Sequence, residues 1–226
     1  MKERAFRFRE TYIAMVALSL VAGYTGSELS LKGDRAAVQA KADNKVIKEY
    51  GTYDGKDFEK EPEINLDEYT ASHQIKYLNV SMPKDEQAYL YALCDAYDID
   101  FGFAMAVIEH ESGYTADVIS STGDYGYFQI NSCNQTWLSK DLGITDLLDP
   151  KQNVRAGMYI LRQLFEKYED AGDVLMAYHF GEGGAKELWN QGIYTSKYSD
   201  AILEKGQKYD EELSKWCMRL EQSVSE

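Results

Sequence analysis

Apolar residues recur at helical spacing along most of the chain beyond residue 82. Tyr89, Leu93 and Tyr97 follow one another every four residues in the stretch MPKDEQAYLYALCDAYDI, which places them on one face of a helix. Pro83 and the acidic residues behind it are typical of the first turn of a helix. The pattern therefore predicts that a helix begins just after Pro83.

Further apolar stripes indicate several more helices. They predict helices over residues 101–112, 151–168 and 196–220. The stretch GDVLMAYHFGEGGAKELWNQG is expected to form a helix, a glycine-rich break and a second short helix. Between residues 112 and 125 the chain is rich in Ser, Thr, Gly and Asp, which predicts a loop, and the YGYFQINS that overlaps its end predicts a short strand or turn. We therefore expect residues 82–226 to form one mainly α domain of ordinary size.

The first 81 residues have a different pattern. MKERAFRFR is basic, and the apolar run from Tyr12 to Tyr24 is uncharged but shorter than the ~20 residues of a bilayer span. This order matches a secretory signal, so we expect an extracellular or cell-wall protein whose residues 1–25 are either cleaved or retained as an N-terminal anchor. Residues 26–81 are polar and charged without a sustained period, and we interpret them as a linker or stalk. Membrane contact is expected only through the N-terminal segment.

Composition and residue spacing argue against nucleic acid as a partner and against a metal or cofactor site. A net charge of −14 disfavours nucleic acid, because the chain lacks the basic surface that phosphates require. The three histidines, at positions 73, 110 and 179, lack metal-ligand spacing, so we expect no metal. GEGGAKE has no preceding strand and no closing Lys-Ser or Lys-Thr, so we expect no cofactor either. Cys94, Cys133 and Cys217 allow one disulfide or none, and the sequence does not choose the pair.

Helical phase separates the three adjacent titratable residues Glu109, His110 and Glu111. On the predicted helix, Glu109 lies on the far side, His110 on a flank, and Glu111 on the apolar face. The apolar residues of that face are Ala104, Val107 and Ile108. A carboxylate at this C-terminal end loses water and meets the negative end of the helix dipole, and both effects favour the protonated form that a general acid requires. Glu111 is therefore the candidate acid, Glu109 and His110 are expected bystanders, and the alternative for Glu111 is a merely solvated or capped helix end.

Four short motifs follow one another between Glu111 and Gly181. They are Glu111-Ser112, then Gly126-Tyr127-Phe128-Gln129, then Asn153 with Gly157, Tyr159 and Leu161, and finally Ala177 and Tyr178 with Gly181. Their order and spacing resemble the lysozyme-like superfamily, in particular its bacterial lytic transglycosylases of the soluble-lytic-transglycosylase type. The resemblance implies a lysozyme-like α+β catalytic domain with little strand content over residues 82–226, acting on peptidoglycan glycan strands.

The resemblance also implies roles for individual residues. Glu111 would protonate the glycosidic oxygen between N-acetylmuramic acid and N-acetylglucosamine, then take the proton of the muramic C6 hydroxyl as a 1,6-anhydro ring closes. The residues implied to contact substrate are Ser112, Gln129, Asn131, Tyr178, His179 and Tyr198. Each has a structural alternative as a cap, a turn residue or a core residue. His179 departs from the family pattern, which has Asn at its position.

A second resemblance concerns Asp124 and leaves more than one reaction possible. DYGYFQINS is similar to animal-type lysozymes, in which an aspartate at the place of Asp124 is the second carboxylate of the site. Paired with Glu111 it would make the protein a hydrolysing muramidase, although the loop between the two is shorter than in those lysozymes. The alternative is that Asp124 is a turn residue without a catalytic role, because Asp and Gly are favoured in turns. The third alternative is an inactive glycan-binding or assembly module on the same fold, and a secretion, conjugation or cell-wall machinery fits as a further partner.

Overall fold

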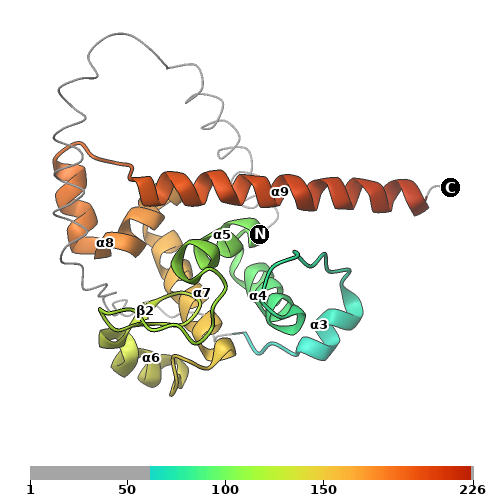
Figure 1. Ribbon diagram of the computed structural model, residues 1–226, viewed down its shortest axis with the longest axis horizontal. Coiled ribbons are helices and arrows are strands. Elements are labelled where there is room, and N and C mark those ends of the chain that lie inside the picture. Colours follow the sequence, from blue (N-terminus) through green and yellow to red (C-terminus); the bar gives the residue numbers. More distant parts are fainter. Residues whose placement is uncertain (1–61, 225–226) are drawn as a thin grey trace, which may run out of the picture. The chain divides into compact units, whose positions relative to one another are not determined.

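The computed structural model describes residues 62–224, which form mostly helices with one short hairpin (Figure 1). In chain order the elements are α3 (Leu66–Ser72), α4 (Lys84–Tyr97), α5 (Phe101–Ser112), β1 (Asp124–Tyr125), β2 (Ile130–Asn131), η1 (Ser132–Asn134), α6 (Gln135–Leu142), α7 (Pro150–Lys167), α8 (Ala171–Asn190) and α9 (Lys197–Val224). The expected mainly α architecture with little strand content is confirmed. The predicted signal or anchor over residues 1–25, and the linker up to residue 61, lie outside the described residues.

The predicted helix boundaries come close to the observed ones. The helices expected over residues 101–112, 151–168 and 196–220 are α5, α7 and α9. The glycine-rich break falls at Gly181, whose φ of 68° and ψ of 159° divide α8 into two helical halves. Sequence patterning missed α6, because this helix of 8 residues buries only Leu138 and Leu142 and so has no sustained apolar stripe.

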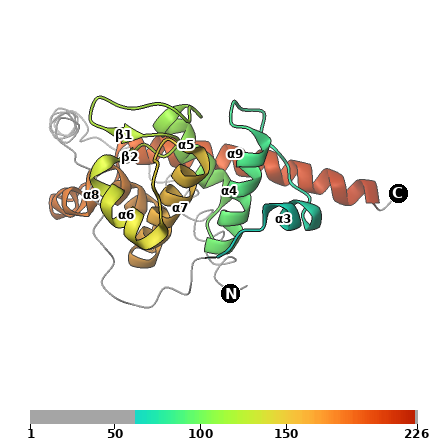
Figure 2. The same cartoon turned by 90° about the horizontal axis from the view of Figure 1, so that it is seen from below.

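Helix α5 lies inside the molecule rather than on its surface. Every residue from Phe101 to Ile108 is buried, as expected of a helix that is apolar on all sides. Asp100 caps its start by accepting a 2.8 Å hydrogen bond from the Phe103 amide, and Gly113 ends it in the left-handed conformation. Helices α4 and α9 both pack against α5 (Figure 2). The C-terminal turn of α5, which carries the candidate acid, is the part that reaches solvent.

Two glycines allow α5 and α9 to approach closely. A Cβ atom at Gly102 would lie 2.1 Å from the Asp210 Oδ1 atom and 3.0 Å from the Gly206 carbonyl oxygen, both on α9. A Cβ atom at Gly206 would lie 3.4 Å from the Phe103 Cα atom. Neither glycine therefore places a side chain between the two backbones, and this contact fixes α9 against the helix that ends in the candidate acid.

The segment before α4 is joined to it by a buried glutamine. The Gln87 side chain donates to the carbonyl oxygens of Leu78 and Met82, at 3.2 and 2.9 Å, and accepts from the Leu78 amide at 2.9 Å. Leu78 and Met82 are themselves part of the core. Residues 62–81, which patterning assigned to the linker, therefore contribute a helix, α3, and a core residue to the described part of the chain.

The described residues contain neither a disulfide nor a membrane-spanning helix. None of the three cysteines is in a disulfide; Cys94 lies in the core, and Cys133 and Cys217 are exposed. Burial raises the pKa of the Cys94 thiol well above its usual value. Among the helices of residues 62–224, none combines the length and the apolar character that a bilayer crossing demands.

Candidate functional site

The candidate acid Glu111 lies in the last turn of α5, where the helix leaves the core. Its side chain is partly exposed, and its Oε1 atom accepts a 2.6 Å hydrogen bond from the Tyr198 hydroxyl. Tyr198 is 5% exposed and comes from the first turn of α9. The structure thus brings together two predicted site residues that are 87 positions apart in the sequence.

The start of α9 is fixed by two serines that cap each other. The Ser196 amide donates to the Ser199 hydroxyl at 2.9 Å, and the Ser199 amide donates to the Ser196 hydroxyl at 3.1 Å. Both serines are buried. Reciprocal bonds of this kind satisfy amides that the first turn of a helix leaves without backbone partners. They hold the turn that carries Tyr198.

Two histidines contact the ring of Tyr198. The His179 imidazole, from α8, stacks on this ring with centroids 4.1 Å apart and an interplanar angle of 16°. The His110 imidazole, from α5, meets the ring edge-on at 4.8 Å and 82°. Both arrangements are favourable for aromatic pairs. The predicted site residue His179 therefore lies against Tyr198, and so does His110, which sequence reasoning had set aside.

Asp124 is enclosed by hydrogen bonds from the turn just before β1 and from β2. Its Oδ2 atom accepts from the hydroxyls of Ser120 and Thr122, at 2.7 and 2.5 Å, and its Oδ1 atom accepts from the Asn131 side-chain amide at 2.9 Å. Asp124 and Asn131 are also opposite each other in the β1–β2 ladder. The Asn131 Oδ1 atom accepts from the Cys133 amide at 3.0 Å and so caps η1. Both predicted site residues, 9% and 6% exposed, are thus built into the hairpin.

The loop between the two strands is fixed by Asn153 of α7. Its Oδ1 atom accepts from the Phe128 amide at 2.9 Å, and its Nδ2 atom donates to the carbonyl oxygens of Tyr125 and Leu147, both at 2.8 Å. Gly126 has a φ of 68°, and a Cβ atom there would lie 2.5 Å from the Asn153 Nδ2 atom. Glycine is therefore required at the start of the Gly-Tyr-Phe-Gln motif.

Gly157 and Tyr178 hold Phe128 of the same motif. A Cβ atom at Gly157 would lie 2.1 Å from the Phe128 ring, so glycine leaves the room that this buried ring fills. The Tyr178 hydroxyl donates to the Phe128 carbonyl oxygen at 2.7 Å, and Tyr178 is completely buried. The structure thus places the hydroxyl of Tyr178, which was predicted to contact substrate, on the backbone of the motif loop, residues 126–129.

Two further predicted site residues also bond to backbone. Gln129 is 6% exposed, has a φ of 45°, and donates from Nε2 to the Gly126 carbonyl oxygen at 2.9 Å. A positive φ is uncommon outside glycine, and such conformations concentrate near functional sites. Ser112 is partly exposed and donates to the Ile108 carbonyl oxygen, one turn back on α5, at 3.0 Å. Ser112 is therefore the member of this pair that solvent, and a ligand, can approach.

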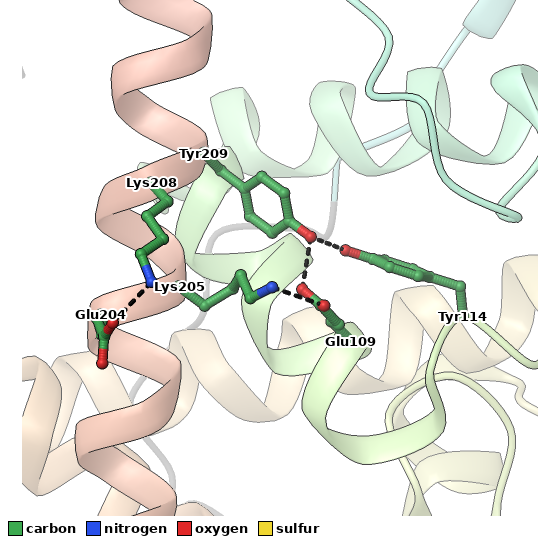
Figure 3. Close-up of polar contacts among 6 residues, drawn as sticks. All are labelled: Glu109, Tyr114, Glu204, Lys205, Lys208 and Tyr209. Carbon is green, nitrogen blue, oxygen red and sulfur yellow. Dashed lines mark hydrogen bonds and ion pairs between the residues drawn. The ribbon is translucent and has the colours of Figure 1, made fainter.

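Glu109 faces α9 and takes part in a network of hydrogen bonds (Figure 3). Its Oε1 atom accepts a 2.8 Å bond from the Lys205 Nζ atom, and its Oε2 atom accepts a 2.5 Å bond from the Tyr209 hydroxyl. The Tyr209 hydroxyl also lies 2.6 Å from the Tyr114 hydroxyl. Burial opposes ionisation of Glu109, but the hydrogen bonds from Lys205 and Tyr209 outweigh burial, so the pKa of Glu109 is lowered.

This network gives Glu109 a task that sequence reasoning missed. Helical phase predicted Glu109 on the side of α5 opposite Glu111, but both carboxylates accept hydrogen bonds from α9. Lys205 and Tyr209 stand four residues apart, which marks one face of α9. The spacing alone does not indicate that this face of α9 packs against α5, so the contact with Glu109 is visible only in the folded structure.

A hollow of about 370 Å³ opens beside the hairpin. It is lined by Tyr125, Ser132, Gln135 and residues 145–148. Neither Glu111 nor Tyr198 is among its lining residues, so this hollow is distinct from the immediate surroundings of the candidate acid.

Comparison with known proteins identifies related sequences around this site. The model of the family described as Transglycosylase SLT domain matches residues 89–201, which run from α4 to the first turns of α9 and include both Glu111 and Tyr198. A protein described as a transglycosylase, from Enterobacteria phage PRD1, is 30% identical over 107 residues, which are 47% of this chain and 37% of the phage protein. The chain thus matches little more than a third of the length of that relative.

Solved structures share the fold. An inactive mutant of the lytic transglycosylase Slt from Pseudomonas aeruginosa has a TM-score of 0.51 and 20% sequence identity, covering 59% of this chain and 25% of that one. The complex of a 70-kDa soluble lytic transglycosylase with bulgecin A has a TM-score of 0.50 and 22% identity, covering 55% and 24%. At these identities the likeness concerns the fold alone, and it confirms the expected fold type.

Proposed function

Because the chain belongs to the transglycosylase SLT domain family, we propose that it cleaves the β-1,4 bond between N-acetylmuramic acid and N-acetylglucosamine in peptidoglycan, with closure of a 1,6-anhydro ring. The observation that carries this proposal is the hydrogen bond from Tyr198 to Glu111, which lies within the matched range. The phage relative is described as a transglycosylase and the solved relatives as lytic transglycosylases. Each is longer than its matched part, so the proposed reaction is assigned to the matched domain.

Glu111 carries out both proton transfers of the proposed reaction. As an acid it gives its proton to the glycosidic oxygen, the bond from that oxygen to the muramic C1 atom breaks, and C1 becomes oxocarbenium-like. As a carboxylate it then takes the proton of the C6 hydroxyl, whose oxygen forms the new bond to C1. The atoms balance without water, and Glu111 ends the cycle protonated, as it began.

Tyr198 orients Glu111 for these steps. Its hydroxyl donates to the Oε1 atom at 2.6 Å from a ring that is almost fully buried. The hydrogen bond strengthens as the carboxyl group becomes negative during the first transfer, because donors bind anionic oxygens more strongly than neutral ones. Tyr198 thus both holds the acid in place and stabilises the charge that develops on it.

We propose a structural role for Asp124 rather than that of a second catalytic carboxylate. A hydrolysing muramidase would use Asp124 to hold a water molecule or to form a covalent intermediate, and either use needs an approachable carboxylate. The Asp124 oxygens instead accept three hydrogen bonds from β2 and from the turn before β1, and the residue is 9% exposed. The side-chain amides of Gln129 and Asn131 are buried and bonded within the protein, so they are not open to a sugar. Direct contact with sugar is therefore proposed for Ser112, which is partly exposed.

Mass spectrometry of digested peptidoglycan tests the proposed function. Wild-type protein should release muropeptides that end in 1,6-anhydromuramic acid, and Glu111→Gln should slow their release by about 10²–10⁴-fold, because an amide cannot transfer the proton. Glu187→Gln changes an exposed glutamate of α8 and is the matched control, which should keep full activity. Reducing-end muropeptides would indicate a muramidase, and no cleavage by folded wild-type protein would indicate a glycan-binding or assembly module.

We further propose that the protein acts outside the cytoplasmic membrane, where peptidoglycan lies. The support is the order of a basic and an apolar segment within residues 1–25. A fusion of these residues to a reporter enzyme that needs disulfides should be active in cells, because disulfides persist only after export. An inactive reporter that remains in the cytoplasmic fraction would contradict export.

A further inference from the structure

We propose that His179 is a positioning residue for the reaction proposed above, acting through Tyr198. Its imidazole supports the Tyr198 ring so that the hydroxyl stays on Glu111. The kinetic test of this inference rests on the proposed function, whereas the positioning role itself is argued from the contacts among the three side chains. It gives His179 a different task from the substrate contact that the family pattern implies.

The three side chains form a continuous series of contacts that ends at the acid. The imidazole of His179 lies nearly parallel to the ring of Tyr198, with centroids 4.1 Å apart and an angle of 16°. The hydroxyl of that ring lies 2.6 Å from the Glu111 Oε1 atom. Because the hydroxyl is at the far end of the tyrosine, a modest rotation about χ1 would carry it out of hydrogen-bond range. A ring stacked on its face opposes such a rotation.

His179 is well placed to give this support, because its own position is fixed. Its chain neighbours Tyr178 and Phe180 are buried, at 0% and 4% exposed. The Phe180 ring meets the imidazole edge-on at 4.5 Å and 76°, and the Tyr178 hydroxyl is bonded to the Phe128 carbonyl oxygen. The kink at Gly181 follows two residues later and separates this turn from the second half of α8. The imidazole therefore presents a rigid surface to Tyr198.

A histidine can make this contact, whereas the asparagine of the family pattern cannot. An asparagine amide has no ring to stack on a phenol, so the parallel contact is particular to the side chain at position 179. His110 also touches the Tyr198 ring, but only at an edge, and it is exposed. His110 is therefore expected to restrain Tyr198 less than His179 does.

Steady-state kinetics of single variants provides the first test. His179→Ala should lower kcat about tenfold with little change in KM, because a misplaced acid slows the chemical step and not binding. His179→Phe keeps a flat ring and should bring kcat back to within about threefold of wild type. His110→Ala removes only the edge contact and should lower kcat less than His179→Ala does.

A double-mutant cycle with Tyr198→Phe separates positioning from other roles. Once the hydroxyl is absent, His179→Ala should lower kcat by less than about twofold more, because the two changes remove the same interaction. Equal losses in the two backgrounds would overturn the inference. So would a His179→Phe variant as slow as His179→Ala with a raised KM, which would identify direct contact with sugar.

Crystal structures of the variants separate failure of this inference from failure of the proposed function. In His179→Ala the Tyr198 hydroxyl should leave hydrogen-bond range of Glu111, and in His179→Phe it should remain there. If wild-type protein cleaves no glycan, the proposed function fails, but this displacement still supports the positioning role. A Tyr198 side chain that keeps its place in His179→Ala overturns the role, whatever the activity.

Discussion

At the residue scale, the site depends on a hydrogen bond between two helices that are distant in sequence. Glu111 ends α5, Tyr198 begins α9, and the hydroxyl and carboxyl oxygens lie 2.6 Å apart. Hydrogen bonds to a charged oxygen are stronger than those between neutral groups. The hydroxyl can be removed while the ring is kept, so its contribution to catalysis is measurable separately from that of the packing.

We expect Tyr198→Phe to lower kcat by about 10- to 100-fold, because the acid loses a preorganised donor in the transition state. The ring still fills its place between His179 and His110, so Tm should change little. Steady-state kinetics and thermal unfolding of the same preparation check both statements. An unchanged kcat would show that Tyr198 does not act on Glu111.

A second residue-scale prediction concerns Asn153, which bonds three backbone groups of the motif loop and its surroundings. We expect Asn153→Ala to lower the free energy of unfolding by about 2–4 kcal/mol, because buried donors and acceptors lose their partners. Gln152→Ala, which removes exposed hydrogen bonds of the neighbouring residue, is the control and should cost less. Urea unfolding measures both, and equal losses would contradict the role of Asn153.

At the element scale, α9 has to lie in a fixed position along α5 for Tyr198 to reach the acid. Gly102→Ala should disturb this contact, because the new Cβ atom would meet Asp210 and the backbone of α9. We expect a loss of about 1–3 kcal/mol in unfolding free energy, together with lower kcat. Gly183→Ala, on an open side of α8, has nothing within 4 Å of the new atom and is the control. A Gly102→Ala variant with wild-type stability would show that the helices are free to adjust.

The bonds from Lys205 and Tyr209 to Glu109 also hold α9 on α5, and their contribution depends on pH. The pKa of Glu109 is lowered in the folded protein, so its stabilising effect is fully present above the unfolded value of about 4.3 and is lost as pH falls through the folded pKa. The difference in unfolding free energy between wild type and Glu109→Gln should therefore shrink below about pH 4.3. A difference that stays constant with pH would contradict this.

The control for that prediction is an ion pair on the same helix. Glu204 accepts from Lys208 at 2.6 Å, but both side chains are largely exposed (Figure 3). Exposed pairs contribute little, because water and salt screen them. Glu204→Gln should leave the unfolding free energy almost unchanged at every pH, measured by the same denaturant titrations.

At the scale of the whole molecule, the local apolar pattern was enough to predict α5, the helix whose last turn carries the candidate acid. The helix runs from Phe101 to Ser112 as expected, and in the structure Asp100 and Gly113 cap its two ends. Helical phase then separates Glu111 from its neighbours. What could not be predicted is the packing of α9 along α5, because it depends on residues such as Gly206 that meet α5 only in the folded chain.

The roles of the residues predicted to contact substrate were harder to predict for a related reason. An amide or a hydroxyl suits a sugar and a backbone carbonyl equally well, so motif residues such as Gln129 and Tyr178 look alike in either role. Their burial and their bonds to Gly126 and Phe128 become visible only once the hairpin and α8 are in place. The stack of His179 on Tyr198 likewise joins two helices whose proximity no local pattern indicates.

In the proposed reaction, Glu111 assists closure of an anhydro ring without consumption of water. Digestion of purified peptidoglycan in water enriched in oxygen-18 tests it most directly, with the released muropeptides analysed by mass spectrometry. We expect 1,6-anhydromuramic ends that carry no heavy oxygen, and their loss in Glu111→Gln. Release of reducing muramic ends in place of the anhydro ends would show that water attacks C1, and would contradict the proposed reaction.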